Sequence, residues 1–375
     1  MRGKVVIAGI GHTAFGRLEG RSPISLITEA VGNAIVDAGI EKDVIDGVLV
    51  KFPTSAPQFM FGSQVAEALG IQPRLGGVWD QGGAANIGLI TYASLAIEAG
   101  LCDVAVICFA DNPKTGSRQN YSRPHGADAT MHGWYGTAAG YGMIARRHMA
   151  EFGTTREQLG AVAIAARRHG AANPNAQLRK PLDMDTYLAS PPVVLPLLRD
   201  DCALISDGGA AIILMSAERA RQLQVAHPVP ILGLGQGNTS WAVAQRPDLT
   251  TTQAVVSGAK AFEMAGLAPS DIDVAQIYDC FTITVPMTLE DYGFCAKGQG
   301  GSFVSGGRIE IDGDLPVNTS GGLLSETGMP GLQLVIEGVR QMRGQANLQV
   351  PNAKTCIVSN QGGVMTTHAT LILGQ

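Results

Sequence analysis

The chain has 375 residues, of which 45% are hydrophobic and 16% are charged, so it can bury a large core and is long enough for two or three domains. Its net charge of −5, with no block of Lys or Arg, argues against nucleic acid as a main partner. No apolar run approaches the roughly 18 residues that span a bilayer, and six scattered cysteines without CxxC pairing indicate a reducing cytoplasm and no metal site.

Strand-like and helical patterns alternate from the N-terminus onward. Residues 4–10, KVVIAGI, are strand-like, and the apolar face of a helix follows at Ile24, Ile27, Val31 and Ile35. A second strand, DGVLVK, spans residues 46–51, and a third, DVAVICFA, spans residues 103–110. This alternation predicts an α/β protein with largely parallel, buried strands.

Between these strands, residues 80–100 (DQGGAANIGLITYASLAIEAG) begin with a glycine-rich turn and run into a helical pattern. Such a turn presents free backbone N–H groups at the positive end of the helix dipole, which suits a negative group. The turn itself carries no reactive side chain, only Gly82, Gly83 and Ala84.

Residues 112–200 break the alternation and are rich in Asn, Pro, Arg, His and Tyr. Two stretches within them look helical, and residues 155–158 could form a capping box. A long insertion in an α/β unit usually covers a site, so we expect a cap over the active site, with a packing or oligomer arm as the alternative.

The first part of the chain is repeated later. Residues 38–46, AGIEKDVID, match residues 265–273, AGLAPSDID, 227 positions on, and residues 82–90 correspond to residues 327–335. In the second copy, a helix face is indicated by Leu332, Val335, Val339 and Met342. We therefore expect two duplicated halves, residues 1–225 with the insertion, and residues 226–375.

Four longer stretches resemble the thiolase superfamily, in particular the sterol carrier protein-type thiolases. They are residues 173–211 (NPNAQ to DGGAA), 278–295 (YDCFTITVPMTLEDYGFC), 318–331 (NTSGGLLSETGMPG) and 359–373 (SNQGGVMTTHATLIL). The resemblance implies a five-layer αβαβα sandwich and a homodimer. It also implies an active site where two buried central helices begin, at the junction of the halves.

The sequence departs from that family at the positions of the thiolase catalytic residues. Gly83 stands at the position of the nucleophilic Cys, Gly328 at that of the His in GHP, and Tyr278 at that of the His in HDCF. Claisen chemistry needs a thiolate and a base, which glycines cannot supply. The bare turn can still stabilise an enolate oxygen, and the space left by the missing Cys could admit a bulkier substrate.

The predicted catalytic residues are Tyr278 first, as an acid or hydrogen-bond donor, then Asn360 and Tyr292. Gly83, Ala84, Gly328 and Gly362 are expected to bind the CoA thioester, and Gln361 could donate a hydrogen bond to an oxyanion. Asp279 should be structural because it points the other way along a strand. Glu326 is either a general base or, more simply, a carboxylate near a helix N-terminus.

The loss of Cys and His resembles the steroid side-chain-cleaving aldolases, which work with a small OB-fold, zinc-ribbon partner. The resemblance implies an acyl-CoA retro-aldolase that cleaves the Cα–Cβ bond of a bulky β-hydroxyacyl-CoA, with CoA as part of the substrate and no covalently bound cofactor. Two alternatives remain, a non-catalytic acyl-CoA or lipid-binding subunit and a Claisen-type acyltransferase with an atypical nucleophile.

Overall fold

The computed structural model describes residues 2–117, 130–329 and 331–375. Within them, nine strands form one sheet in the order β3-β2-β4-β7-β1-β8-β11-β10-β9. The strands are β1 (Val5–His12), β2 (Gly47–Lys51), β3 (Leu75–Trp79), β4 (Val104–Asp111), β7 (Gly208–Ser216), β8 (Val229–Asn238), β9 (Val274–Gln276), β10 (Thr355–Gly362) and β11 (Thr367–Gly374).

The strand pattern occurs twice. In the first half β2 runs parallel to β3 and β4, β4 is antiparallel to β7, and β7 is antiparallel to β1. In the second half β9 is parallel to β10, β10 is antiparallel to β11, and β11 is antiparallel to β8. Among its described residues, the second half has no full strand that corresponds to β3. At that place, next to β9, there is a single parallel bridge between Ala275 and Val317. The boundary between residues 225 and 226 stays a prediction.

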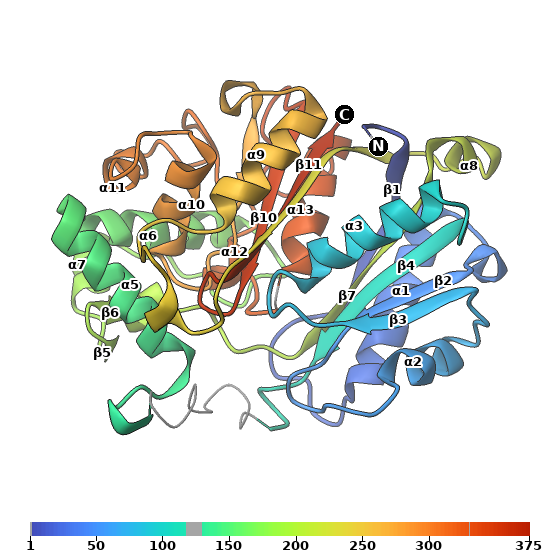
Figure 1. The fold of residues 1–375 in the computed structure, drawn as a ribbon, viewed down its shortest axis with the longest axis horizontal. Helices are drawn as coiled ribbons and strands as arrows, with labels where there is room; N and C mark the ends of the chain where they lie inside the picture. Colours follow the sequence, from blue (N-terminus) through green and yellow to red (C-terminus); the bar gives the residue numbers. More distant parts are fainter. Residues whose placement is uncertain (1, 118–129, 330) are drawn as a thin grey trace.

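Helices cover both outer faces and fill the middle (Figure 1). One outer layer holds α1 (Pro23–Ala38) and α2 (Phe61–Leu69), and the other holds α9 (Ala254–Ala265) and α10 (Thr284–Tyr292). Between the two halves of the sheet lie α3 (Ala85–Glu98) and α13 (Leu332–Arg343), whose side chains share one core with strands of both halves. These layers confirm the predicted αβαβα arrangement.

Alternation along the strands decides which core each residue joins. On β4, Val104 and Val106 pack with α1 and α2, whereas Ala105 and Ile107 pack with α3 and α13. Because both faces of the strands are covered, the strands are apolar almost throughout. The helix face predicted at Leu332, Val335, Val339 and Met342 is buried in the central core.

The insertion packs against the second half. It contains α5 (Gly136–Phe152), α6 (Arg156–Ala172), α7 (Met184–Leu188), β5 (Pro192–Val194) and β6 (Leu197–Leu198). The predicted capping box of Thr155 and Gln158 opens α6. Residues of α6 join the core of α9 and α10, and residues of α5 join Phe281 and neighbouring side chains. Residues 118–129 of the insertion lie outside the described residues.

The remaining elements are short connectors. They are η1 (Lys42–Val44), η3 (Arg199–Asp201), α8 (Ala217–Gln222), η4 (Val243–Gln245), η5 (Pro269–Asp271), α11 (Gly300–Phe303) and α12 (Gly322–Ser325). In the described part of the chain, no helix is both long and apolar enough to cross a membrane. All six cysteines are described and carry free thiols.

Candidate active site

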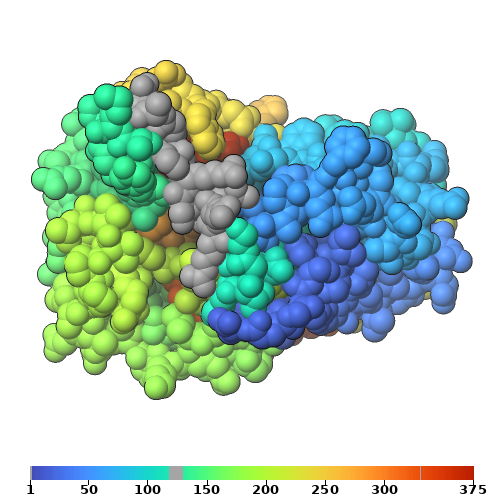
Figure 2. All heavy atoms as spheres, turned by 90° about the horizontal axis from the view of Figure 1, so that it is seen from below, coloured from blue at the N-terminus to red at the C-terminus, as the bar shows by residue number. Residues whose placement is uncertain are grey.

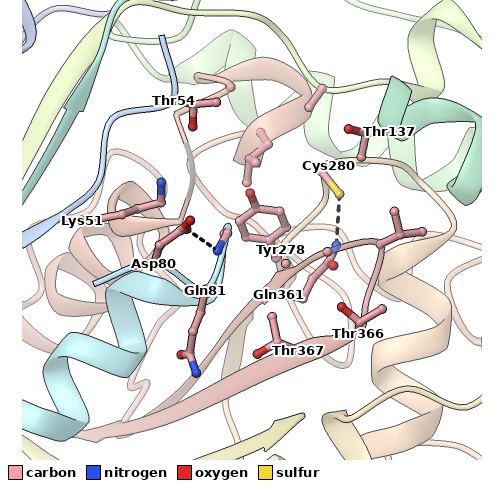
Figure 3. Close-up of a pocket in the computed structure, with 18 of the residues that line it drawn as sticks. Lys51, Thr54, Asp80, Gln81, Thr137, Tyr278, Cys280, Gln361, Thr366 and Thr367 are labelled. Carbon is pink, nitrogen blue, oxygen red and sulfur yellow. Dashed lines mark hydrogen bonds between the residues drawn. The ribbon is translucent and has the colours of Figure 1, made fainter. Parts of the chain in front are cut away.

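A cavity of about 1180 Å³ lies where the two halves and the insertion meet. Figure 2 shows a hollow between residues of the first half and those of the insertion, with atoms of the second half visible at its floor. Its wall is formed by the loops after β2 and β3, by α5, by the loop before β7, and by the loops after β9 and β10. The polar side chains of the wall include Lys51, Thr54, Asp80, Gln81, Thr137, Tyr141, Tyr278, Cys280, Gln361, Thr366 and Thr367 (Figure 3).

The glycine-rich turn predicted from the sequence forms one part of this wall and begins α3. Gly82 adopts a left-handed conformation with φ of 56°, and its N–H donates to the Asp80 carboxylate over 2.9 Å. The N–H of Ala84 donates to the carbonyl of Gln81 over 3.2 Å. The positive end of the α3 dipole therefore faces the cavity with an acidic side chain beside it.

The side chain of Tyr278 occupies the space next to Gly83. A Cβ atom added to Gly83 would lie 2.5 Å from Cζ of Tyr278 and closer still to the tyrosine hydroxyl and the carbonyl oxygen of Gln361. The expected vacancy at the missing Cys is therefore filled by the phenol of Tyr278 and by backbone, and it does not enlarge the cavity. The hydroxyl of Tyr278 lies instead directly beside the turn that begins α3.

Residue 328 must also be glycine, for a different reason. A Cβ there would lie 2.5 Å from the carbonyl carbon of Leu204 and closer to its oxygen, so no side chain fits. The N–H of Gly328 donates to Oγ of Ser206 over 3.0 Å. Both Gly328 and Gly362 line the cavity, whereas Ala84 is buried behind the turn and is not part of the wall. Binding of the CoA thioester by these residues stays a prediction.

A chain of hydrogen bonds links three further wall residues. The hydroxyl of Tyr141 donates to Oε1 of Gln361 over 2.8 Å, and Nε2 of Gln361 donates to Sγ of Cys280 over 3.0 Å. Burial raises the pKa of Cys280 to about 12 and raises the pKa of Tyr141 well above its usual value. Burial therefore favours the protonated form of both groups, and Cys280 is not poised as a thiolate nucleophile. The sequence prediction missed Tyr141 and Cys280.

Two predicted catalytic residues do not reach the cavity. Tyr292 lies in the outer core with α9, where its hydroxyl hydrogen-bonds Oγ1 of Thr370 over 2.7 Å and burial raises its pKa. Asn360 is fully buried and packs against Gly331. Because side chains alternate along β10, its neighbour Gln361 faces the cavity while Asn360 faces away. The geometry does not support a catalytic role for Tyr292 or Asn360.

The two acidic candidates also point away from the cavity. Asp279 accepts the N–H groups of Leu323 and Leu324 at the start of α12, over 2.7 and 3.3 Å, which is the structural role that was expected. Glu326 is buried and accepts hydrogen bonds from Ser320 and Asn173. Burial raises the pKa of each carboxyl to about 7.

Lys51 is a wall residue that the sequence interpretation did not identify. It ends β2, its side chain is 2% exposed, and Nζ lies 4.0 Å from the ring centroid of Phe109. Burial lowers its pKa, while the carboxylates of Asp111 and Asp80 act in the opposite direction. Among the described wall residues it is the one Lys or Arg. A lone Lys at the end of an apolar strand was the only sequence signal.

The chemistry available in this cavity is limited by these residues. Among the described side chains, no group of three or more His, Cys, Asp or Glu is arranged to hold a metal ion. The wall offers a helix N-terminus, a phenol beside it, a buried amine and several amide and hydroxyl groups. Such groups can polarise a carbonyl and move protons, but they do not provide a thiolate.

Comparison with known proteins gives consistent results over the whole chain. Residues 235–375 match the family model described as "Thiolase C-terminal domain-like". The chain is 36% identical to a steroid side-chain-cleaving aldolase of Thermomonospora curvata, covering 99% of this chain and 98% of the relative. It is 35% identical to a 17-hydroxy-3-oxo-4-pregnene-20-carboxyl-CoA lyase of Mycobacterium tuberculosis, with full coverage of both chains. The solved Ltp2-ChsH2(DUF35) aldolase superposes with a TM-score of 0.90 at 37% identity, covering 100% of this chain and 98% of that one.

Proposed function

Since the chain belongs to the thiolase superfamily, in its branch of sterol carrier protein-like aldolases, we propose that it is a carbon–carbon lyase acting on acyl-CoA thioesters. The reaction is a retro-aldol cleavage of the Cα–Cβ bond in a bulky β-hydroxyacyl-CoA, without a covalent acyl-enzyme. The observation that most strongly supports this proposal is the position of the Tyr278 hydroxyl, which fills the space that a nucleophile on residue 83 would need.

The cavity supplies the parts that this reaction needs. A base removes the β-hydroxyl proton, the Cα–Cβ bond breaks, and the negative charge develops on the thioester oxygen as an enolate. The N-terminus of α3 stabilises that charge, and Tyr278 donates a hydrogen bond and then a proton. The absence of a side chain at Gly83, Gly328 and Gly362 lets neighbouring segments of the site approach closely, since a Cβ at any of them would collide with protein atoms.

The CoA part of the substrate needs more positive charge than this cavity has. Coenzyme A carries phosphate groups, and the described wall residues include a single Lys or Arg, the deeply buried Lys51. A partner subunit that supplies the remaining phosphate contacts resolves this shortage. The solved relative is the Ltp2-ChsH2(DUF35) aldolase, whose name includes a DUF35 component. A small OB-fold, zinc-ribbon protein of this kind is the partner we propose.

A homodimer formed through the edge of the first half is also part of the proposal. β3 is the outermost strand of the sheet. Exposed apolar side chains lie on this strand and on the adjacent helix α3: Val78 of β3 is 37% exposed, and Tyr92 and Leu95 of α3 are 38% and 53% exposed. An unpaired strand edge flanked by such residues is typical of an interface between two copies of a chain.

The two alternative functions have less support. A Claisen-type acyltransferase would need a nucleophile at the α3 turn, and the contacts of Gly83 leave no room for one. A non-catalytic subunit would be expected to have a collapsed or filled site. The cavity is instead open and converges on Tyr278 and the Gly83 turn.

The proposed function is tested with the full chain co-expressed with a DUF35-type protein as the proposed partner. The complex is incubated with a 3-hydroxyacyl-CoA that carries a bulky, apolar β-carbon, and products are followed by mass spectrometry. We expect a ketone or aldehyde together with the shortened acyl-CoA. Binding without cleavage would favour the non-catalytic subunit, and an acyl adduct in the intact mass of the chain would favour the acyltransferase.

A further inference from the structure

Lys51 stands where two parallel strands end side by side at the cavity. It pairs in register with Trp79 of β3, and the chain then continues through Asp80 into the turn at Gly82 and Gly83. The amine is therefore held next to the N-terminus of α3, where the thioester oxygen is proposed to bind. Lys51, Asp80 and Tyr278 all line the cavity, and Figure 3 shows Tyr278 between the pair Lys51 and Asp80 and the pair Cys280 and Gln361.

The surroundings of the amine leave part of its bonding capacity open. Nζ donates to the carbonyl of Phe52 over 3.2 Å and lies over the ring of Phe109. The ion pairs within 4.0 Å among the described residues do not include it. A buried amine with so few polar partners is unusual, because burying an ammonium is costly unless it is paired. An oxygen of a ligand in the cavity would complete its hydrogen bonds.

The acidic neighbours of Lys51 are occupied by other contacts. The carboxylate of Asp111 accepts the N–H groups of Thr54 and Ser55 over 2.9 and 3.0 Å. The carboxylate of Asp80 accepts the N–H of Gly82. These are the charged groups that face the amine, from the end of β4 and from the turn after β3. They favour the ammonium form, and burial against Phe52 and Phe109 favours the neutral amine.

The geometry points to Lys51 as the general base that removes the β-hydroxyl proton in the proposed cleavage. This assignment rests on the proposed function and names the base that the reaction requires. A β-hydroxyl lies only a few bonds from the thioester oxygen, so its base must lie near the α3 turn, as Lys51 does. Buried lysines are known to act as bases because burial shifts their protonation readily.

Other wall groups are less suited to this step. Tyr141 and Cys280 hold their protons tightly because burial raises the pKa of each. Asp80 is exposed, and its carboxylate is bound to Gly82. Tyr278 is needed as the proton donor to the enolate. Lys51 is then the wall group left to accept a proton.

The protons and electrons of the step balance. The neutral amine of Lys51 takes the β-hydroxyl proton and becomes an ammonium. The O–H bonding pair forms the new carbonyl, the Cα–Cβ bond breaks, and its electron pair is delocalised onto the thioester oxygen. Tyr278 protonates Cα, and the proton on Lys51 returns to the phenolate through water, which restores both groups.

The test compares Lys51→Met and Lys51→Arg with wild type in the cleavage assay, with Lys260→Met on the exposed face of α9 as the matched control. We expect both Lys51 variants to lose roughly 10²- to 10⁴-fold in kcat, since this is the usual contribution of a general base, while Lys260→Met is unchanged. Arginine keeps the charge but cannot give up its proton. A Lys51→Arg enzyme with near wild-type kcat would show that charge alone matters and overturn the assignment.

Two further measurements keep the outcome clear. Binding of the shortened acyl-CoA to each variant shows whether the site is folded. If a variant does not fold, the pH dependence of kcat/KM is measured for the wild-type enzyme at several temperatures. On the acidic side, log kcat/KM should rise with pH with a slope of one. The apparent pKa of that rise should decrease on warming, as it does for amines. A temperature-independent limb indicates a carboxylate and overturns the assignment. A wild-type complex that binds substrate but cleaves nothing overturns the proposed function, and this inference with it.

Discussion

The hydroxyl of Tyr278 lies where the side chain of residue 83 would begin. The turn at the start of the central helix α3 therefore needs glycine, because the phenol and the Gln361 carbonyl leave no room for a Cβ. One contact thus leaves no room for a nucleophilic side chain at residue 83 and places the proposed proton donor beside the helix N-terminus. Both consequences can be tested by substitution.

Replacing Gly83 by Ala or Cys should damage the site without creating a thiolase. The new Cβ must displace the ring of Tyr278 and a backbone carbonyl, and overpacking of this kind costs about 1–3 kcal/mol of stability. We expect a lower midpoint in urea unfolding and loss of cleavage. Gly32→Ala is the control, because a Cβ at that helical position meets no atom within 4 Å. It should leave stability unchanged or raise it by up to about 1 kcal/mol. A stable, active Gly83→Cys enzyme would contradict the steric argument.

Tyr278→Phe should abolish cleavage while leaving the fold intact. It removes the proposed proton donor and keeps the ring that packs in the central core. We expect kcat to fall roughly 10²-fold or more, with binding of the shortened acyl-CoA little changed. Tyr292→Phe is the matched control, since its hydroxyl bonds Thr370 in the outer core and should affect stability by about 1 kcal/mol but not kcat. Equal losses in the two variants would remove Tyr278 from the mechanism.

Glu326→Gln should stabilise the protein at alkaline but not at acidic pH. Burial, and then the nearby carboxylate of Glu337, raises the folded-state pKa of Glu326 to about 7, above the value of 4.5 for a free side chain. The folded state therefore binds the proton more tightly, and stability falls as pH rises from 4.5 to 7. Glutamine resembles the protonated acid, so we expect a gain of about 1–3 kcal/mol at pH 8 and little at pH 4.5.

The measurement for Glu326→Gln is urea unfolding at both pH values. Glu41→Gln serves as an exposed control and should show the same pH dependence as wild type. A gain for Glu326→Gln that is equal at both pH values would show that the carboxyl is not protonated by burial.

Leu95→Glu should separate the proposed homodimer. Leu95 lies on the exposed face of α3 near Tyr92, which stacks on Trp79 of the edge strand with ring centroids 6.1 Å apart. A charge there would be buried unpaired in the interface, so the mass measured by light scattering should fall to that of one chain. Val36→Glu, an exposed apolar position on α1, should change nothing. A Leu95→Glu protein that remains dimeric would place the interface elsewhere.

The layers of the fold could be predicted from the sequence because they depend on local patterns. The repeated strand–helix unit, the apolar face of α13 and the capping box of α6 all follow from periodicity and capping chemistry within short windows. The departures at positions 83, 278 and 328 could likewise be found by aligning motifs along the chain.

The arrangement of the site was harder to predict because it depends on contacts between distant segments. Gly83 and Tyr278 are 195 positions apart (278 − 83), so nothing in either motif shows that one fills the space of the other. Along β10 a single step decides whether Asn360 or Gln361 faces the cavity, which motif spacing does not resolve. In the sequence, Lys51 resembles a solvated residue at the end of a strand. In the structure, Phe109 of the neighbouring strand covers its amine.

The carbonyl of Leu204 lies against Gly328 and leaves no room for any side chain at position 328. A histidine at position 328 would require the Leu204 segment to move first, and a cysteine at position 83 would require Tyr278 to move away. Neither substitution alone therefore gives a side chain at these positions the room that a condensing enzyme needs. Engineering carbon–carbon bond formation on this scaffold should begin by remodelling the two obstructing segments, before any reactive group is introduced.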